Sequence, residues 1–472
     1  MRTLQVNNVA WVDCKFINDR MDSSSYITQI NMGLFDLYKK ESTDFQIKTL
    51  DDICNKIVDG PFGSDILEED YVEQGVPFIR VQNITEYGFE DSNLVFISEE
   101  ANKRISRSEC RPGDLVFTKT GRLGTVCVLN NEYSNYNIRG DLAKLQLKSQ
   151  IDPYYVMSYL NSNFGTKITN SYSSGSTRGR ILISNIKKIV IPIPSPEIQK
   201  YIGDKVRKAE ELREEAKRLK KEAETFLYEM IQLKPLNDFD KDMYSFVNSN
   251  YIDSERLDSE YYKTKYITLE KLLKSKKVTS FKDIIIESKY GASVPADYTM
   301  VGIPFIRGNN LTDNEINIDD IVYLNKKLKD EVKDHHVNTG DILITRSGTV
   351  GISAVVDEKC DGFSFGSFMI KLRIDMRIWN PYYIAAFLNS FWGKWQIERL
   401  QNGAVQQNIN LQEIGRIIIP IISKENQDKI EELIKNYINK KRQSKQLIQE
   451  AKQDVEDLIE GNFDMSKVKA NS

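Results

Sequence analysis

The chain contains 472 residues, carries a formal net charge of −3, and is 40% hydrophobic and 28% charged. This length allows about two to four domains with real cores, and the composition is that of an ordinary soluble protein. The charge lacks the basic excess of many nucleic-acid binders, so a role on DNA has to come from local loops or from a partner. Without an apolar run of membrane-helix or signal-peptide length, we expect a cytoplasmic protein with no membrane partner.

Cysteine and histidine usage excludes several kinds of site. The cysteines have no paired spacing, which argues against a disulfide framework and against a zinc ribbon. The only histidines are the adjacent His335 and His336, so a histidine triad or a multi-histidine metal site is not expected. The five cysteines are Cys14, Cys54, Cys110, Cys127 and Cys360. We expect neither a metal nor a cofactor.

In chain order, an N-terminal segment, 1–44, precedes a predicted globular domain at 45–195. Residues 1–15 have no assigned role. In the domain, "GDLVFTKT" and "IVIPIP" predict strands, the first after a Gly-Asp turn. Asp152 followed by Pro153 predicts a helix start, because Asp is a good N-cap and Pro suits the first helical position.

A long helix is predicted at 196–235, with Ser195 as its N-cap and Pro196 at its first position. Its apolar residues alternate in spacings of three and four, as in a coiled-coil seam. They are Ala209, Leu212, Ala216, Leu219, Ala223, Phe226, Met230 and Leu233.

The rest of the chain repeats this order. A linker at 236–277 precedes a second globular domain at 278–423, in which Asn380-Pro381 predicts a helix start. A second long helix is predicted at 424–461, with Gly461 as its stop, before a tail at 462–472. Its seam contains Ile430, Leu433, Tyr437, Ile448, Ala451, Val455 and Leu458, with Lys441 and Ser444 at two further seam positions. One such helix alone would expose its seam, so we expect the two to form an antiparallel pair; packing of each only on its own globular domain is the alternative.

The two halves of the chain are copies. "VPFIRVQNI" at 76–84 matches "IPFIRGNNL" at 303–311, and "RPGDLVFTKTGRLGTV" at 111–126 matches "NTGDILITRSGTVGIS" at 338–353, both offset by 227 residues. The start recurs as well, since "FINDRMDSSSY" from 16 is similar to "YIDSERLDSEYY" from 251. This is a tandem duplication of one large unit and not a short solenoid repeat.

A protein that reads base edges needs bidentate donors and acceptors, meaning Arg, Lys, Asn and Gln, on loops narrow enough for a groove, and three loops in each copy qualify. The first loop contains Arg80, Gln82 and Asn83, matched by Arg307, Asn309 and Asn310. The second contains Lys119, Thr120 and Arg122, matched by Arg346, Ser347 and Thr349. The third contains Thr177, Arg178 and Arg180, matched by Gln406, Gln407 and Asn408.

Each loop has a second interpretation. Arg80 and Arg307 are identical in the two copies and could brace the fold through a salt bridge or touch phosphate. Lys119 and Arg346 exchange like for like, which fits phosphate contact better than base reading. The third loop diverges most within a shared framework, as two readers of different half-sites would, although drift after duplication gives the same pattern.

The order of globular unit, long helix, globular unit and long helix resembles the specificity subunit of type I restriction–modification systems. The "GDLVFTK" and "GDILITR" strands, the "PFIR" phrase and the junction "SNIKKIVIPIPSPEIQ" are similar to that family's target recognition domains and their exits into helix. The resemblance implies an α+β protein with pseudo-twofold symmetry, in which two similar α/β target recognition domains are separated and joined by two long antiparallel coiled-coil helices.

The resemblance also implies a function. The chain would be a non-catalytic DNA-recognition subunit, and each recognition domain would read one half of a bipartite asymmetric double-stranded site. The helices would fix the spacer and dock methyltransferase subunits, expected to number two, and restriction or translocase subunits would join the complex.

Two other functions remain. A self-contained DNA methyltransferase or nuclease would need motifs that are missing here. "NPYY" at 380–383 resembles a methyltransferase motif, but it and its counterpart "DPYY" at 152–155 both open predicted helices. A coiled-coil adaptor without a DNA role would leave the large duplicated globular units unexplained.

Overall fold

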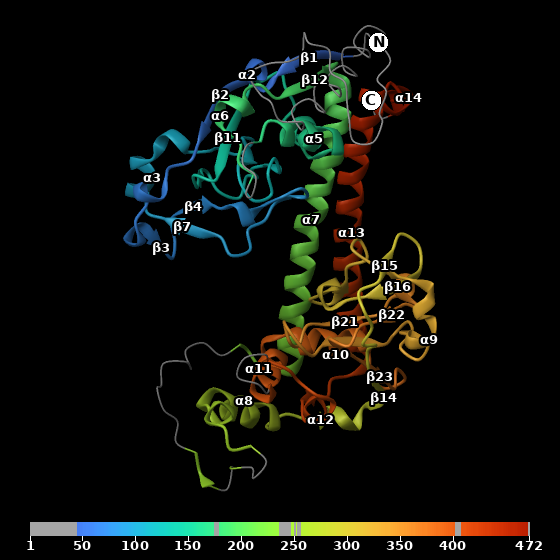
Figure 1. The fold of residues 1–472 in the computed structure, drawn as a ribbon. Helices are drawn as coiled ribbons and strands as arrows, with labels where there is room; N and C mark the ends of the chain where they lie inside the picture. The colour runs from blue at the N-terminus through green and yellow to red at the C-terminus, as the bar shows by residue number, and fades with distance from the viewer. Residues whose placement is uncertain are drawn as a thin grey trace. The chain divides into compact units, whose positions relative to one another are not determined.

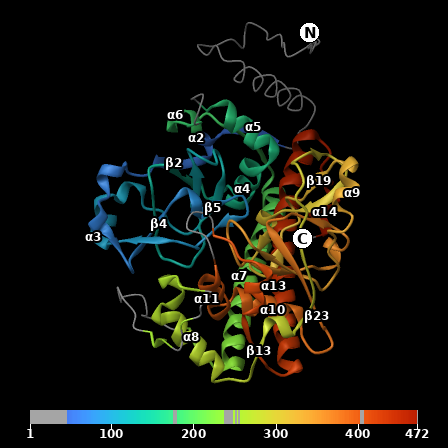
Figure 2. The same cartoon turned by 60° about the horizontal axis from the view of Figure 1, so that its bottom comes forward.

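The computed structural model describes residues 45–173, 179–235, 247–249, 252, 256–401 and 407–470. The chain divides into two compact units (Figures 1 and 2). The first unit ends at Glu214 and resumes at Lys441, and the second comprises Glu215–Lys440. Each unit therefore contains one globular region and part of both long helices. The predictions for residues 1–44, and for most of 236–255, lie outside the described residues.

The first unit is built on two four-stranded sheets, with strand orders β10-β4-β7-β3 and β2-β11-β8-β9, and on the pairs β1-β12 and β5-β6. Its strands are β1 (Phe45–Thr49), β2 (Cys54–Asp59), β3 (Tyr71–Val72), β4 (Val76–Ile79), β5 (Ile84–Thr85), β6 (Gly88–Phe89), β7 (Val95–Ile97), β8 (Leu115–Thr118), β9 (Val126–Val128), β10 (Asn137–Ile138), β11 (Leu142–Leu147) and β12 (Val190–Pro194).

The second unit repeats these sheets with the same pairings. Its four-stranded orders are β22-β16-β19-β15 and β14-β23-β20-β21, and its pairs are β13-β24 and β17-β18. Its strands are β13 (Val278–Ser280), β14 (Ile285–Tyr290), β15 (Tyr298–Thr299), β16 (Ile303–Ile306), β17 (Leu311–Thr312), β18 (Glu315–Ile316), β19 (Val322–Leu324), β20 (Ile342–Thr345), β21 (Ser353–Val355), β22 (Ser364–Phe365), β23 (Met369–Ile374) and β24 (Ile418–Pro420). The duplication predicted from the sequence is confirmed.

Each unit also contains short helices. The first unit has α2 (Leu50–Ile53), α3 (Glu99–Arg104), α4 (Pro153–Asn161), α5 (Asn163–Ser171), α6 (Ile183–Ile186) and α14 (Ser466–Ala470). The second has α8 (Thr264–Lys274), α9 (Lys329–Val332), α10 (Pro381–Asn389), α11 (Phe391–Leu400) and α12 (Leu411–Gly415). Of these helices, α4 packs on β9 and α10 on β21. One large core in each unit joins strands, short helices and long-helix residues.

The "DPYY" and "NPYY" phrases are structural, as the helix-start signal predicts. The Asp152 carboxylate accepts a hydrogen bond from the Tyr154 N–H at 2.9 Å, and the Asn380 side chain accepts one from the Tyr382 N–H at 2.9 Å. The hydroxyl of the following tyrosine is buried and donates to the exit strand. In the second unit, Tyr383 donates to the Pro420 carbonyl at 2.5 Å. These contacts explain the motif without any methyltransferase role.

A buried glutamine in the first turn of each long helix joins that helix to its globular region. The Gln199 side chain accepts from the Asp152 N–H at 3.1 Å and donates to the Pro194 carbonyl at 2.9 Å. Gln427 accepts from the Asn380 N–H at 2.8 Å and donates to the Ile422 carbonyl at 3.1 Å. The same link in both repeats holds each helix start against its globular region.

The two long helices are α7 (Pro196–Ile231) and α13 (Lys424–Glu460), and they pair antiparallel. In the first unit, the Ser444 hydroxyl donates to the Ala209 carbonyl at 2.6 Å, and Lys205 pairs with Asp454. In the second unit, Lys440 pairs with Glu215 at 3.0 Å. Figures 1 and 2 show the helices side by side within each unit. Both helices also contribute residues to the cores of their units, but the contacts between them contradict the alternative that each packs only on its own domain.

The structure buries five of the eight predicted seam residues of α7 and leaves three partly buried. The buried ones are Ala209, Leu212, Ala216, Ala223 and Leu233, and the partly buried ones are Leu219, Phe226 and Met230. Leu227 and Ile231 are buried in the core of the second unit, whereas Phe226 and Met230 are only partly buried. Because this end of α7 packs on a globular core as well as on α13, it buries a wider stripe than a coiled-coil seam. The helix also ends at Ile231, before the predicted 235, since Gln232 adopts a left-handed φ of 54° and the Leu233 N–H bonds back to the Tyr228 carbonyl at 3.1 Å. At the other end of the chain, Gly461 ends α13 with a φ of 76°, as predicted.

We expect Leu227→Ala to lower the free energy of unfolding by roughly 2–5 kcal/mol, because it leaves a cavity in a packed core. Met230→Ala is the matched control on the same helix and should cost roughly 1 kcal/mol or less. Denaturant unfolding of both variants measures the difference. A larger cost for Met230→Ala would favour the seam predicted from the sequence.

Candidate nucleic-acid interface

The first predicted loop is a 3₁₀ turn, at Val81–Asn83 in one repeat and Gly308–Asn310 in the other. The side-chain amides of Asn83 and Asn310 are both 0% exposed. Asn83 accepts from the Arg80 N–H at 3.0 Å and donates to the Glu90 carbonyl at 3.0 Å, and Asn310 makes the matching bonds. This burial does not fit the prediction that these two residues contact DNA, because both polar ends of each amide bond to the chain itself.

The arginines of the first loop are half-buried and brace the turn. The Arg307 guanidinium pairs with Asp320 at 2.9 Å, and Arg80 donates to the Asn93 carbonyl. This geometry matches the bracing interpretation of the two identical arginines. Gln82 and Asn309 are the exposed members of the loop, and Asn309 donates to Asp320 at 3.3 Å.

The basic residue at the start of the second loop has a carboxylate partner in the first repeat and an aromatic partner in the second. The Lys119 ammonium is 3% exposed and pairs with Asp59 at 3.3 Å. Burial lowers the pKa of Lys119, and Asp59 offsets part of that effect. A phosphate contact by Lys119 does not fit this burial. Its counterpart Arg346 is half-buried, with its guanidinium 4.7 Å from the centre of the Tyr290 ring.

The structure brings the second and third loops together in each repeat. Thr120 forms a bridge with Arg180, and Ser347 forms one with Asn408. The Arg346 guanidinium also donates to the Asn408 side chain at 3.3 Å. Sequence positions about 60 residues apart therefore form one edge, as a shared reading surface requires.

The remaining residues predicted to contact DNA are either exposed or outside the part of the chain that the structure describes. Arg122, Arg180, Thr349 and Gln407 are exposed. Thr177, Arg178 and Gln406 lie outside the described residues.

A cavity of about 650 Å³ in the second unit joins the first and second loops. Its lining includes four predicted residues: Arg307, Asn309, Ser347 and Thr349. Tyr298 and Phe368 also line it, and the sequence predictions missed both. Extending the repeat alignment would have found Phe368, since "RGDLAKLQL" at 139–147 matches "GSFMIKLRI" at 366–374 with the same offset of 227.

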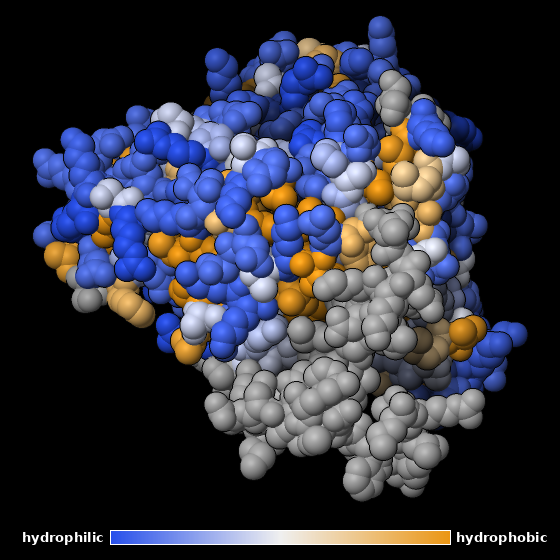
Figure 3. All heavy atoms as spheres, turned by 90° about the horizontal axis from the view of Figure 1, so that it is seen from above, coloured by the Kyte–Doolittle hydropathy of each residue, from blue (hydrophilic) through white to orange (hydrophobic). Residues whose placement is uncertain are grey.

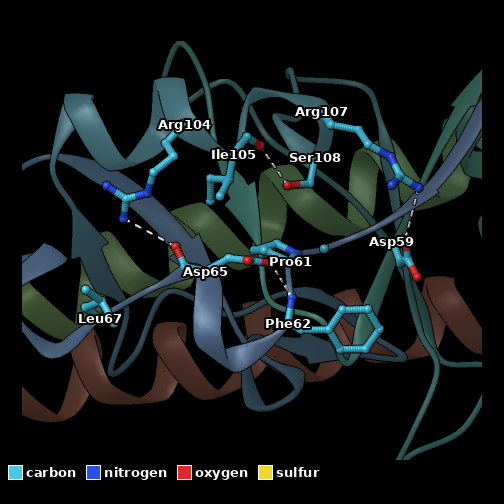
Figure 4. Close-up of a pocket in the computed structure, with 10 residues that line it drawn as sticks. Asp59, Pro61, Phe62, Asp65, Leu67, Arg104, Ile105, Arg107 and Ser108 are labelled. Carbon is cyan, nitrogen blue, oxygen red and sulfur yellow. Dashed lines mark hydrogen bonds and ion pairs between the residues drawn. The ribbon is translucent and has the colours of Figure 1, made fainter.

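The first unit has a cavity at another place, lined by Asp59, Phe62, Leu67, Arg104 and Arg107 among others. Figure 4 shows Arg104 and Arg107 at opposite sides of it. Arg104 donates a hydrogen bond to the Asp65 backbone carbonyl at 3.3 Å, and Arg107 donates one to the Asp59 carboxylate at 3.2 Å. Phe62 and Leu67 are exposed at its edge. Among the predicted loop residues that the structure describes, none lines this cavity, although the lining residue Asp59 pairs with Lys119.

Outside its grey residues, the surface drawn in Figure 3 is mainly hydrophilic, with smaller hydrophobic areas between the hydrophilic ones. Across the described ranges, no group of three His, Cys, Asp or Glu could hold a metal ion. No helix in the same ranges has the length and apolar character to cross a membrane.

Comparison with protein-family models places both repeats in one family. The model described as the type I restriction modification DNA specificity domain matches residues 42–225 and 237–453. The chain belongs to the type I restriction–modification specificity family. The resemblance of the repeated phrases to this family is thereby confirmed, and with it the fold of two similar mixed domains joined by long helices.

Curated relatives are also specificity subunits. The type I restriction enzyme MjaIX specificity subunit of Methanocaldococcus jannaschii is 25% identical over 65% of this chain and 66% of its own length. The EcoBI specificity subunit of Escherichia coli is 26% identical over 30% of each chain. The chain thus spans just under two thirds of the first relative's length and less of the other's.

Solved structures similar to the chain include other members of the specificity family. The S subunit of a type I restriction-modification system from M. genitalium has a TM-score of 0.46, with 15% identity over 89% of this chain and 96% of that one. The HsdS subunit of Thermoanaerobacter tengcongensis has a TM-score of 0.30, with 14% identity over 89% of this chain and 98% of that one.

Proposed function

We propose that this chain is the DNA-recognition subunit of a type I restriction–modification complex. Residues 45–195 and 278–423 each read one half of a bipartite asymmetric site. The observation that carries this proposal is that two copies of one sheet scaffold hold different side chains at equivalent positions. The exposed Arg122 occupies the position of the exposed Thr349, and Arg180, which bridges to Thr120, occupies the position of Asn408, which bridges to Ser347. A duplicated scaffold with exchanged surface chemistry suits two readers of different sequences.

The reading surface of each domain is the edge where the second and third loops meet. In the first domain its exposed members are Arg122 and Arg180, with Gln82 on the first loop. In the second domain they are Thr349 and Gln407, with Asn309 on the first loop. Arginine reads guanine, and Asn and Gln read adenine, through bidentate hydrogen bonds in the major groove. The buried Asn83, Asn310 and Lys119 position the loops from behind.

The long helices fix the spacer between the half-sites and dock two methyltransferase subunits, with restriction or translocase subunits joining the assembly. The continuity of α7 and α13 from one compact unit into the other supports this role. Catalysis belongs to the partner subunits, and this chain contributes recognition.

We expect the isolated chain to bind DNA with a Kd of about 1 µM or weaker at physiological salt, in the range of non-specific binding. A net charge of −3 offers little counterion release, so affinity has to come from the assembled complex. Adding methyltransferase subunits should bring the Kd to about 10 nM or tighter. Fluorescence anisotropy over a salt series measures both states. Tight binding by the chain alone, with a steep salt slope, would contradict this expectation.

The function is tested by co-expressing the chain with the methyltransferase subunits of its own system and sequencing the methylated positions. Methylation at one bipartite motif that disappears without the chain is the expected result. Methylation that persists without the chain would favour an adaptor role. Binding of S-adenosylmethionine and methyl transfer by the purified chain alone would favour a self-contained enzyme.

A further inference from the structure

A fourth segment lies directly beside the second loop in each repeat, at residues 139–141 in the first and 366–368 in the second. The Lys119 N–H donates to the Asp141 carbonyl at 2.8 Å, and the Arg346 N–H donates to the Phe368 carbonyl at 2.8 Å. The segment begins alike in both repeats. The Arg139 N–H bonds to the Ile79 carbonyl at 3.0 Å, and the Gly366 N–H bonds to the Ile306 carbonyl at 3.0 Å. Residues 139–141 and 366–368 therefore make the same backbone hydrogen bonds in the two repeats but carry different side chains.

The side chains of this segment are charged in the first repeat and uncharged in the second. In the first repeat, Arg139 is exposed, and the Asp141 carboxylate accepts a hydrogen bond from the Thr120 hydroxyl at 3.2 Å. In the second repeat, Gly366 and Phe368 replace the charged pair, and Phe368 is 55% exposed. Isolated exposed apolar residues are normal on protein surfaces, so exposure alone implies nothing. Phe368, however, lines the same cavity as Arg307, Asn309 and Thr349, and so belongs to the candidate reading surface.

We infer that residues 139–141 and 366–368 form a fourth recognition segment, in which position 141/368 sets the preference for one base of each half-site. Phe368 contacts the C5-methyl group of a thymine in the second half-site, since an aromatic ring at a groove edge reads that methyl. Asp141 accepts a hydrogen bond from the exocyclic amino group of a cytosine in the first half-site. This inference rests on the proposed function, because it assumes that each domain reads one half-site.

Uracil scanning tests the Phe368 contact directly. The complex with methyltransferase subunits is titrated with duplexes carrying its methylated motif, in which each thymine of the second half-site is replaced in turn by deoxyuridine. At one position the loss of the methyl should weaken binding by about fourfold, as expected for one apolar carbon group removed from the interface. The Phe368→Ala complex should bind the thymine duplex more weakly and show no further loss with uracil there. Equal uracil sensitivity of the two complexes at every position would overturn the inference.

Exchanging the side chain tests the specificity. Phe368→Asp should move the preference at that one position from thymine toward cytosine, with the first half-site unchanged in the methylated motif. Ile378→Asp is the matched control, since Ile378 is 60% exposed and does not line the cavity. Its motif should stay as in the wild type. If wild-type complexes methylate no bipartite motif, the proposed function fails. If they do, and Phe368→Asp leaves the motif and its methylation rate unchanged, only this inference fails.

Discussion

Replacing residues 278–423 by the corresponding region of another specificity subunit is expected to change one half of the methylated motif and leave the other half unchanged. The region is suited to replacement because β13 and β24 pair antiparallel, with Val278 opposite Pro420. Both ends of the grafted region therefore lie next to each other, on one two-stranded sheet. The core of the second unit also includes residues of α7 and α13, so donor residues that face Leu227 and Ile430 need to be apolar and of similar volume.

The reciprocal graft of 45–195 provides the control. The first repeat has the same closure, with Phe45 opposite Pro194 in the β1-β12 pair. This graft should change the other half of the motif. Sequencing of methylated DNA from cells carrying each graft gives the result. A graft that altered both halves at once would show that the domains do not read independently.

Lengthening both long helices by one heptad is expected to lengthen the non-specific spacer by about one to three base pairs, with both half-sites unchanged. The insertion points are Glu214/Glu215 in α7 and Lys440/Lys441 in α13, which are the borders of the two compact units. They lie at one level of the helix pair, because Glu215 pairs with Lys440. Seven residues preserve a heptad seam and add about 10 Å, or roughly three base pairs of 3.4 Å.

DNA twist limits the gain in spacer length. Three base pairs also rotate one half-site by roughly 100° about the duplex axis, which DNA twisting or domain tilt has to absorb. A heptad in α7 alone is the control, and it should abolish activity because it removes the match between the two helices. An active double insertion that retained the original spacer would show that these helices do not set the distance.

Local sequence signals gave much of the fold. The duplicated phrases, the Asp152-Pro153 and Asn380-Pro381 helix starts and the stop at Gly461 all have local physical causes, and the structure contains each of them. The predicted α7 seam left out Leu227 and Ile231, because these residues pack on a core formed by distant segments. A heptad rule considers only one partner helix.

The candidate site was harder to predict for a similar reason. Asn83 and Lys119 were predicted from their polar side chains alone. Whether such a side chain faces solvent depends on its partners in the fold, and the contacts of Lys119 with Asp59 and of Asn83 with Glu90 cannot be read from a local sequence pattern. Phe368 was not predicted because the sequence criterion for base reading considers polar side chains only. Comparing the two repeats position by position recovers it, since Asp141 occupies the same backbone site.

Sequencing of methylated bases in DNA from cells carrying the complete system, with and without this chain, tests whether the chain confers the sequence specificity. We expect one asymmetric motif of two specific parts separated by a fixed non-specific spacer, present only when the chain is expressed. Methylation at a single uninterrupted motif, or methylation that persists when the chain is deleted, would contradict this expectation.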